Sequence, residues 1–271
     1  MNLTSPSQVK SWCIEHEFHP NKTLGQNFLI DKNILEAIVD AGLEGAGEAP
    51  CILEIGPGLG VLTEEMLRRG ARVSAIEKDP VLGERLKAEL AAYDNFSLSI
   101  GDALDPRIMA EAAEKAGAPF DAMVSNLPYQ AGTRILLELV QAREIPSMTV
   151  LLQSEVAERL AAKEGSKARS LAGVWAQLDY DVKILRKVSQ NSFWPRPEVG
   201  SSVARLVRHD RNIALDAEKR AFFHKITKKA FEHRRKQLAS TFKNMIKSTR
   251  RAEELSVDEW IETVENIYTK G

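Results

Sequence analysis

Short apolar segments that alternate with helical segments between residues 50 and 150 constrain this fold more than any other feature. Each apolar segment has five or six residues, a length that favours a buried strand over a buried helix. Strands joined by helices become parallel neighbours through right-handed crossovers, and the helices cover both faces of the sheet. We therefore predict an α/β fold with a parallel, doubly wound sheet. The strand candidates are "CILEI" (51–55), "ARVSAI" (71–76), "FSLSI" (96–100), "FDAMV" (120–124) and "MTVLLQ" (148–153).

Beyond these segments, the pattern of the chain changes at about Asp210. Two further strand candidates precede that point, and the loop between them, "SQNSFWPRPEVGS", contains two prolines that make it extended and stiff. After Asp210 the pattern is one of amphipathic helices without strands. We predict an α/β domain at residues 1–208 and a small all-helical domain at residues 209–271. The two further strand candidates are residues 180–188 and 202–207.

The first 30 residues show no regular pattern, and a helix is expected at residues 31–41 with Asp31 as its N-cap. No apolar run approaches the ~18 residues that a membrane span needs, so we expect no membrane partner and a cytoplasmic location. Cys13 and Cys51 are too few for a disulfide framework and are expected to be reduced.

A glycine-rich loop follows the first of the five strand candidates. The stretch "LEIGPGLG" places Gly56, Gly58 and Gly60 between that strand and a helix, and glycines there let the backbone turn sharply and approach a ligand. Position 61 is valine, so the dinucleotide fingerprint G-x-G-x-x-G is absent. The pattern E-x-G-x-G-x-G resembles the first motif of Rossmann-type methyltransferases, which hold S-adenosylmethionine. A tight turn without a ligand is the alternative.

Two acidic residues follow the next two strands. Glu77 ends the second strand, where a carboxylate can accept hydrogen bonds from both hydroxyls of a ribose. Asp102 follows the third strand, where it could accept from the exocyclic amine of an adenine. Three successive strand ends that carry the glycines, Glu77 and Asp102 favour a cofactor site over a turn without a ligand.

The stretch "SNLPYQ" leaves the fourth strand beside this predicted site. The Asn126 amide oxygen and the Leu127 carbonyl could each accept one N6–H of an adenine and direct the nitrogen lone pair at a methyl group. Pro128 removes a backbone donor and fixes the turn, and Tyr129 can stack on the base, a contact of about 1–3 kcal/mol. Such an adenine must be unpaired or flipped out of a helix. An ordinary turn with a packed tyrosine is the alternative.

The loop "NSFWPRPEVGS" offers a second aromatic surface. Phe193 or Trp194, stiffened by Pro195 and Pro197, could close on the other face of the base. A hydrophobic hairpin that plugs the core explains the same residues equally well, and the sequence leaves both explanations open.

Residues 219–251 are strongly basic although the whole chain is nearly neutral. This segment contains twelve Lys or Arg and one acid, Glu232, a net charge of +11, whereas the whole chain carries −1. A solvated helix face is the ordinary explanation, and an interface with nucleic acid is the alternative.

Six stretches, which are distributed over almost the whole chain, together resemble the small-subunit ribosomal RNA adenine dimethyltransferase family. The resemblance implies a Rossmann-like class I S-adenosylmethionine-dependent methyltransferase sheet with a small C-terminal all-helical domain. It also implies N6,N6-dimethylation of two adjacent adenosines in a hairpin loop near the 3′ end of 16S rRNA, within an assembling 30S particle. We expect a monomer without a metal site. The stretches are "LGQNFLIDKNIL", "LEIGPGLGVLTEEM", "SNLPY", "LLQSEVAERL", "FWPRPEVGSSV" and "AFEHRRKQL".

The same resemblance implies roles for individual residues, with the "QNFL" residues closing over the cofactor and Phe193 stacking on the target base. The implied cofactor site comprises Asn27, Leu29, Gly56, Gly58, Glu77, Asp102 and Asn126. The implied catalytic site comprises Asn126, Leu127, Pro128, Tyr129 and Phe193. The implied RNA-docking residues are Arg234, Arg235 and Lys236 of "HRRK".

The chain departs from the family pattern in two places. Family members commonly continue "NLPY" with N-I-S-T, whereas this chain has "QAGT", and they carry a Tyr-Gly pair where this chain reads "GSKARSLAG". Two other functions stay open. One is methylation of large-subunit rRNA, as in the related Erm-type enzymes, and the other is a non-catalytic role in ribosome assembly.

Overall fold

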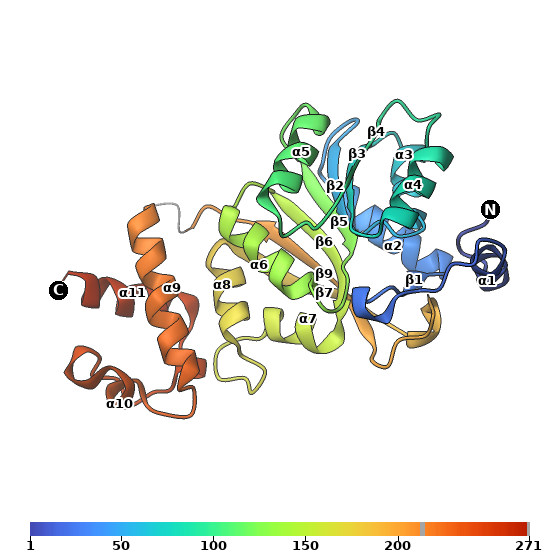
Figure 1. Cartoon of the computed structure of the whole chain (residues 1–271). Helices are drawn as coiled ribbons and strands as arrows, with labels where there is room; N and C mark the ends of the chain where they lie inside the picture. The colour runs from blue at the N-terminus through green and yellow to red at the C-terminus, as the bar shows by residue number, and fades with distance from the viewer. Residues whose placement is uncertain (212–214, 270–271) are drawn as a thin grey trace. The chain divides into compact units, whose positions relative to one another are not determined.

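The computed structural model describes residues 1–211 and 215–269 (Figure 1). The chain forms two compact units, one of Met1–Ala157 with Lys183–Val207 and the other of Glu158–Val182 with Arg208–Gly271. This division differs from the expected one because Glu158–Val182 groups with the C-terminal helices. The expected change of character near residue 208 coincides with the start of the last segment of the second unit.

A seven-stranded sheet in the order β4-β3-β2-β5-β6-β9-β7 is the main element of the fold. The pairs among β2 to β6 are parallel, as expected for the strands of residues 50–150, whereas β9 runs antiparallel to β6. Parallel neighbours need a crossover, usually a helix, and β9 enters the sheet after a loop. The strands are β2 (Cys51–Ile55), β3 (Arg72–Glu77), β4 (Phe96–Ile100), β5 (Ala122–Asn126), β6 (Ser147–Gln153), β7 (Tyr180–Val188) and β9 (Ser201–Arg208).

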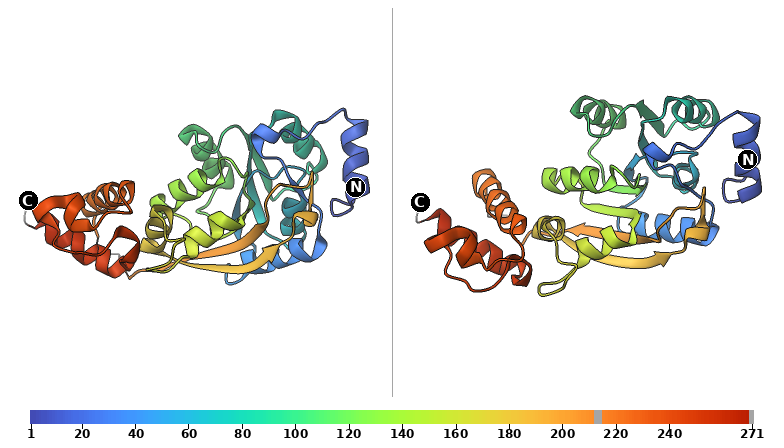
Figure 2. Two further views of the ribbon diagram at one scale, coloured as in Figure 1. Left: turned by 90° about the horizontal axis from the view of Figure 1, so that it is seen from below. Right: turned by 60° about the horizontal axis from the view of Figure 1, so that its bottom comes forward.

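Helices of the first unit cover both faces of this sheet (Figure 2). On β3, Val73 and Ala75 pack into the apolar cluster that also holds α2 and α3 residues, whereas the Ser74 hydroxyl between them donates to the Ala112 carbonyl of α5 on the other face. The alternation follows from the strand period of two residues. The helices are α2 (Lys32–Leu43), α3 (Val61–Arg68), α4 (Pro80–Glu89), α5 (Pro106–Ala116), α6 (Gly132–Ala142) and α7 (Ser154–Ala161), the last of which continues into the second unit.

The N-terminal segment is not irregular, contrary to expectation. Helix α1 (Pro6–Glu15) begins with proline at its first turn, where the fixed φ suits a helix and the missing N–H is not needed. It buries only Val9, Trp12 and Cys13, and this short apolar stripe explains why periodicity did not reveal it. A two-stranded antiparallel sheet follows, formed by β1 (Phe28–Leu29) and β8 (Phe193–Trp194).

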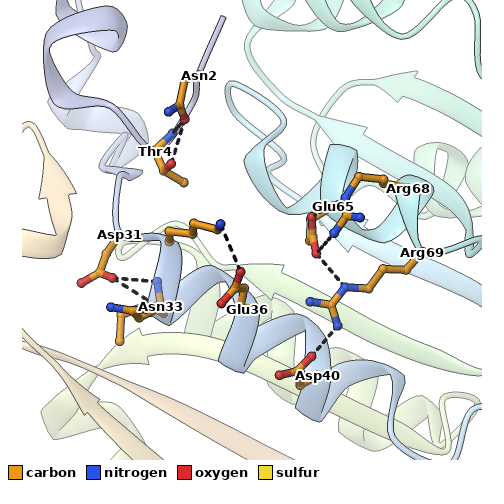
Figure 3. Close-up of polar contacts among 11 residues, drawn as sticks. Asn2, Thr4, Asp31, Asn33, Glu36, Asp40, Glu65, Arg68 and Arg69 are labelled. Atoms are coloured by element: carbon orange, nitrogen blue, oxygen red, sulfur yellow. Dashed lines mark hydrogen bonds and ion pairs between the residues drawn. The ribbon is translucent and has the colours of Figure 1, made fainter.

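Charged side chains join α2 to α3 (Figure 3). Arg69 donates to Glu65 at 2.7 Å and also pairs with Asp40 of α2, while Arg68 donates to the same Glu65. Exposed pairs of this kind contribute at most about 1 kcal/mol each. The Asp31 carboxylate accepts from the backbone N–H groups of residues 33 and 34, so its predicted role as the N-cap of α2 is confirmed.

The second unit has its own apolar cluster, centred on the fully buried Trp260 of α11. Val174 and Leu178 of α8 belong to this cluster, which explains why their segment joins this unit. Asp179 at the end of α8 pairs with Arg220 of α9 at 2.6 Å. The helices are α8 (Leu171–Asp179), α9 (Ala217–Glu232), α10 (Leu238–Phe242) and α11 (Val257–Tyr268), and no strand occurs in the described residues from 215 to 269.

The unusual stretch "GSKARSLAG" is organised by Arg169, which is fully buried. Its Nη1 donates to the Ala162 carbonyl at 2.6 Å and to the Gln177 side-chain oxygen at 2.5 Å. Burial lowers the pKa of this guanidinium. The arginine therefore fixes the loop at the place where the family pattern has a Tyr-Gly pair.

None of the helices within the described ranges combines the length and apolar character that crossing a bilayer requires.

Candidate functional site

A cavity of about 330 Å³ lies at the carboxyl ends of the central strands of the first unit. The chain passes from β2 outward to β3 and β4 and then returns to β5 on the other side of β2, and ligands of doubly wound sheets bind at such reversals. Ten predicted site residues line the cavity: Asn27, Leu29, Gly56, Gly58, Glu77, Asp102, Asn126, Leu127, Pro128 and Tyr129.

The glycine loop needs its glycines for two reasons. Gly58 and Gly60 have φ values of +60° and +87°, which side chains disfavour. A Cβ on Gly58 would also come within 3.3 Å of the Phe28 ring, and one on Gly60 within 2.7 Å of Leu86. The loop can therefore pack under the N-terminal segment and still leave its backbone facing the cavity.

Glu77 holds the glycine loop to the end of β3. Its carboxylate accepts from the Gly58 N–H and from the Asp79 N–H, each at 2.9 Å, and only 6% of the residue is exposed. Burial raises its pKa above the ordinary value, although these backbone N–H groups oppose the shift. A carboxylate has about four acceptor positions, so Glu77 can still receive a hydrogen bond from a ribose hydroxyl.

Glu54 is a second buried carboxyl group beside the cavity. Thr63 of α3 donates its hydroxyl to Glu54 at 2.7 Å, and the whole residue is buried at the end of β2. Burial raises the pKa of Glu54 to about 8, with the nearby Glu77 acting in the same direction. Glu54 is therefore protonated at neutral pH.

The raised pKa of Glu54 predicts a pH-dependent stability. Between the ordinary pKa of 4.5 and the folded value of about 8, the folded chain keeps a proton that the unfolded chain has lost. Stability contributed by this group should fall as pH rises through that window, by up to about 1.4 kcal/mol per pH unit. Glu54→Gln, which is neutral throughout, should remove this slope in urea unfolding. Equal slopes for both proteins would contradict the assignment.

Asp102 lines the cavity but already has partners. One carboxylate oxygen accepts from Lys78 at 2.7 Å and the other from the Leu104 N–H at 3.0 Å. The Lys78 ammonium, followed by the Leu104 N–H, lowers the pKa of Asp102, so it is ionised. An adenine amine would have to share one of these oxygens.

The "NLPY" turn is held by hydrogen bonds of Asn126, Pro128 and Tyr129. The Asn126 amide nitrogen donates to the Asn27 carbonyl at 3.0 Å, and no described residue donates to its amide oxygen. The Pro128 carbonyl accepts from the Gly132 N–H at 2.7 Å, and the Tyr129 hydroxyl bonds to Ser201. Burial raises the pKa of Tyr129, so its phenol is neutral. The turn is therefore rigid and still offers an acceptor to the cavity.

Two glycines pack closely on this turn. A Cβ on Gly25 would approach the Tyr129 backbone nitrogen to 3.0 Å, and one on Gly132 would approach the Leu127 Cβ to 2.9 Å. Gly132 is part of "QAGT", where the chain leaves the family pattern. The departure therefore concerns how closely α6 approaches Leu127.

The structure does not bring Phe193 to the cavity. Its ring is 3% exposed and packs in the main core cluster, and β8 pairs it with Leu29. Trp194 points the other way, as strand alternation requires, and packs against the N-terminal cluster. Stacking of Phe193 on a base stays a prediction that this burial does not favour, whereas the core-plug alternative agrees with it.

The basic "HRRK" residues are in the second unit and are exposed. Arg234 donates to Glu253 at 2.6 Å and to the Lys167 carbonyl at 3.1 Å, so part of its role is to hold this unit together. Arg235 and Lys236 are the better candidates for contact with a polyanion.

Sequence reasoning missed several residues that the fold brings to the cavity. Leu3 lines it although it lies before any recognised motif, and Gln26 lines it while donating to Asp79 at 2.7 Å. Gln26 stands inside the "LGQNFL" stretch and could have been included. Nothing in the sequence around Leu3 indicates a ligand.

The chain matches a known protein family. A family model described as ribosomal RNA adenine dimethylase matches residues 17–268. The Deinococcus radiodurans protein named ribosomal RNA small subunit methyltransferase A is 46% identical over 204 residues, which cover 75% of this chain and 67% of that protein. A protein of the same name from Alkaliphilus oremlandii is 33% identical over 286 residues, with 99% of each chain covered.

Solved structures agree on the fold. A dimethyladenosine transferase from Plasmodium falciparum superposes with a TM-score of 0.76 at 21% identity, covering 90% of this chain and 98% of that one. The 23S rRNA methyltransferase ErmE gives a TM-score of 0.65 at 24% identity, covering 89% and 100%. The predicted class I methyltransferase fold is thereby confirmed. The family model spans nearly the whole chain, and the chain therefore belongs to the ribosomal RNA adenine dimethylase family, whose members are S-adenosylmethionine-dependent methyltransferases.

Proposed function

We propose that this chain transfers four methyl groups from S-adenosylmethionine to the N6 atoms of two adjacent adenosines. The proposed target is a hairpin loop near the 3′ end of 16S rRNA in an assembling 30S particle, and the enzyme acts as a monomer. The observation that carries the proposal is that the Asn126–Tyr129 turn and the Glu77-anchored glycine loop line one cavity.

The cavity fits a nucleoside-containing cofactor. Its volume of about 330 Å³ is within the usual range for small-molecule sites, and Gly56 and Gly58 of the glycine loop line it. Glu77 would accept the ribose hydroxyls, and Asp102 would face the adenine. Asn27 and Leu29 would close the site from the N-terminal side. The bound cofactor supplies a methyl group on a cationic sulfur.

Asn126 and Leu127 would orient the target amine. Because the Asn126 nitrogen is held by the Asn27 carbonyl, the amide oxygen is fixed as an acceptor for one N6–H. The Leu127 carbonyl would accept the other, and Tyr129, held by Ser201, would support the base. The chain then contributes positioning and electrostatics and needs no strong base, because the methylated nitrogen can release its proton to water.

The relatives favour a small-subunit target over a large-subunit one. Several are named ribosomal RNA small subunit methyltransferase A, whereas ErmE shares the fold at 24% identity. The test is to incubate the protein with labelled S-adenosylmethionine, small subunits that lack the modification and large subunits, and then to map the label. We expect label on two adjacent adenosines. Label only in large-subunit RNA, or none in either subunit, would refute the proposal.

The second unit would dock on the rRNA. Replacing Arg235 and Lys236 with alanine should weaken RNA binding and flatten its salt dependence, by about 0.7–0.9 in log–log slope for each phosphate that the variant no longer neutralises. The measurement is RNA affinity across a salt series. A matched control neutralises Lys87 and Arg107, which are exposed on the first unit and paired with local acids. An unchanged slope in the Arg235 and Lys236 variant would make that face an ordinary solvated one.

A further inference from the structure

Residues 1–16 precede the part of the chain that matches the family model, yet they contribute to the cavity. Leu3 lines the cavity and is only 7% exposed. It belongs to an apolar cluster with Leu59, which follows Gly58 in the glycine loop, and with Leu82 of α4. Both of these leucines also line the cavity, close in sequence to Gly58 and Glu77.

A hydrogen-bonded turn holds Leu3 in this position. The Asn2 side-chain oxygen accepts from the Thr4 N–H at 3.0 Å and from the Thr4 hydroxyl at 2.8 Å (Figure 3). The Asn2 N–H donates to the Gln8 side-chain oxygen at 2.7 Å, which ties the turn to the first half of α1. An Asx turn of this kind fixes the backbone on either side of Leu3.

Helix α1 is in turn joined to the glycine loop. Arg85 of α4 places its guanidinium 4.8 Å from the centre of the Trp12 ring and donates from Nη1 to the Leu59 carbonyl at 2.7 Å. A cation over an indole ring is attracted to it, more strongly when both are partly buried. The turn, the helix and the glycine loop are thus connected through Trp12 and Arg85.

We propose that Leu3 is a binding residue for the adenosyl part of the cofactor, and that Asn2 is its positioning residue. This inference rests on the proposed function. Leu3 belongs with Leu59 and Leu82 at the side of the cavity where Glu77 would hold the ribose, rather than with the Asn126 turn. An apolar wall there excludes water from the ribose and strengthens its hydrogen bonds to the carboxylate.

The test measures binding of S-adenosylhomocysteine and of 5′-methylthioadenosine, which lacks the amino-acid part, by titration calorimetry. Leu3→Ala should weaken both by about tenfold, equivalent to about 1.4 kcal/mol. Asn2→Ala should weaken both several-fold, whereas Asn2→Asp, which keeps the acceptor for Thr4, should bind like the unaltered protein. Ile14→Ala is the matched control, because Ile14 is on α1 but 68% exposed.

Each outcome separates this inference from the function on which it rests. If the unaltered protein binds neither of the two compounds, the proposed function is refuted. Normal binding by Leu3→Ala, or equal losses in Asn2→Ala and Asn2→Asp, would overturn the inference alone. If Leu3→Ala melts early, the comparison of Asn2→Ala with Asn2→Asp still decides, since both variants keep Leu3.

Discussion

Asn126→Ala should lower the rate of methyl transfer by at least ~10²-fold, the loss typical of removing one preorganised hydrogen-bonding group. The substitution removes the only side-chain acceptor that the "NLPY" turn would offer to the target amine, as well as the bond to the Asn27 carbonyl. Cofactor affinity should stay within a few-fold, because Glu77 and the glycine loop are untouched. The measurement is single-turnover methylation of unmodified small subunits together with calorimetric cofactor binding.

Asn95→Ala is the matched control for this experiment. The Asn95 amide also donates to a backbone carbonyl, that of Ala71 at 2.7 Å, but it does not line the cavity. Its loss should reduce stability and leave the rate of methyl transfer unchanged. A rate in Asn126→Ala equal to that of Asn95→Ala would remove Asn126 from the catalytic site.

Glu77→Ala should weaken cofactor affinity by at least ~10²-fold. Hydrogen bonds contribute about 0.5–3 kcal/mol each, most where the acceptor is charged, and the variant would lose those that Glu77 makes to the ribose. It would also leave the N–H groups of Gly58 and Asp79 without their acceptor, which loosens the glycine loop. The measurement is calorimetric binding of S-adenosylmethionine. As the pH is lowered, Glu77 takes up a proton and the affinity for the cofactor should fall. Because burial raises the pKa of Glu77, this loss should begin at a pH above the ordinary pKa of glutamate.

The control for Glu77 is Glu259→Ala in the second unit. Glu259 likewise accepts a backbone N–H, that of Ser256 at 2.8 Å, but it is part of a helix cap. The Glu259→Ala variant should be less stable than the unaltered protein and should bind the cofactor with unchanged affinity. If Glu77→Ala binds the cofactor as well as Glu259→Ala does, the ribose contact is refuted.

Much of the first unit could be predicted from periodicity, because its strands are short, apolar and separated by helices. The segments 51–55, 96–100 and 180–188 match β2, β4 and β7 in full, and the others differ from the observed strands by one or two residues at their ends. Periodicity failed at α1 and α8. The first buries too few residues to produce a stripe. The second packs into an apolar cluster whose other buried residues lie more than 30 positions further along the chain.

The candidate site was predictable where residues follow strand ends and not elsewhere. Glu77, Asp102 and Asn126 follow neighbouring strands, so sheet topology alone brings them to one cavity. Phe193 was expected in a loop and lies in the short strand β8, where the direction of a side chain depends on the partner strand. Pairing with β1 turns its ring into the core.

By itself, the sequence determined the alternation of strands and helices, the order of the motifs and the chemistry available at each strand end. These properties depend on the spacing of residues along the chain, which is the same whether or not the chain is folded. Only the tertiary structure decided that Glu54 is protonated, that Asp102 is paired with Lys78 and that Leu3 walls the cavity. Those properties arise from burial and from contacts between residues 9 to more than 50 positions apart, and such contacts exist only after the chain has folded.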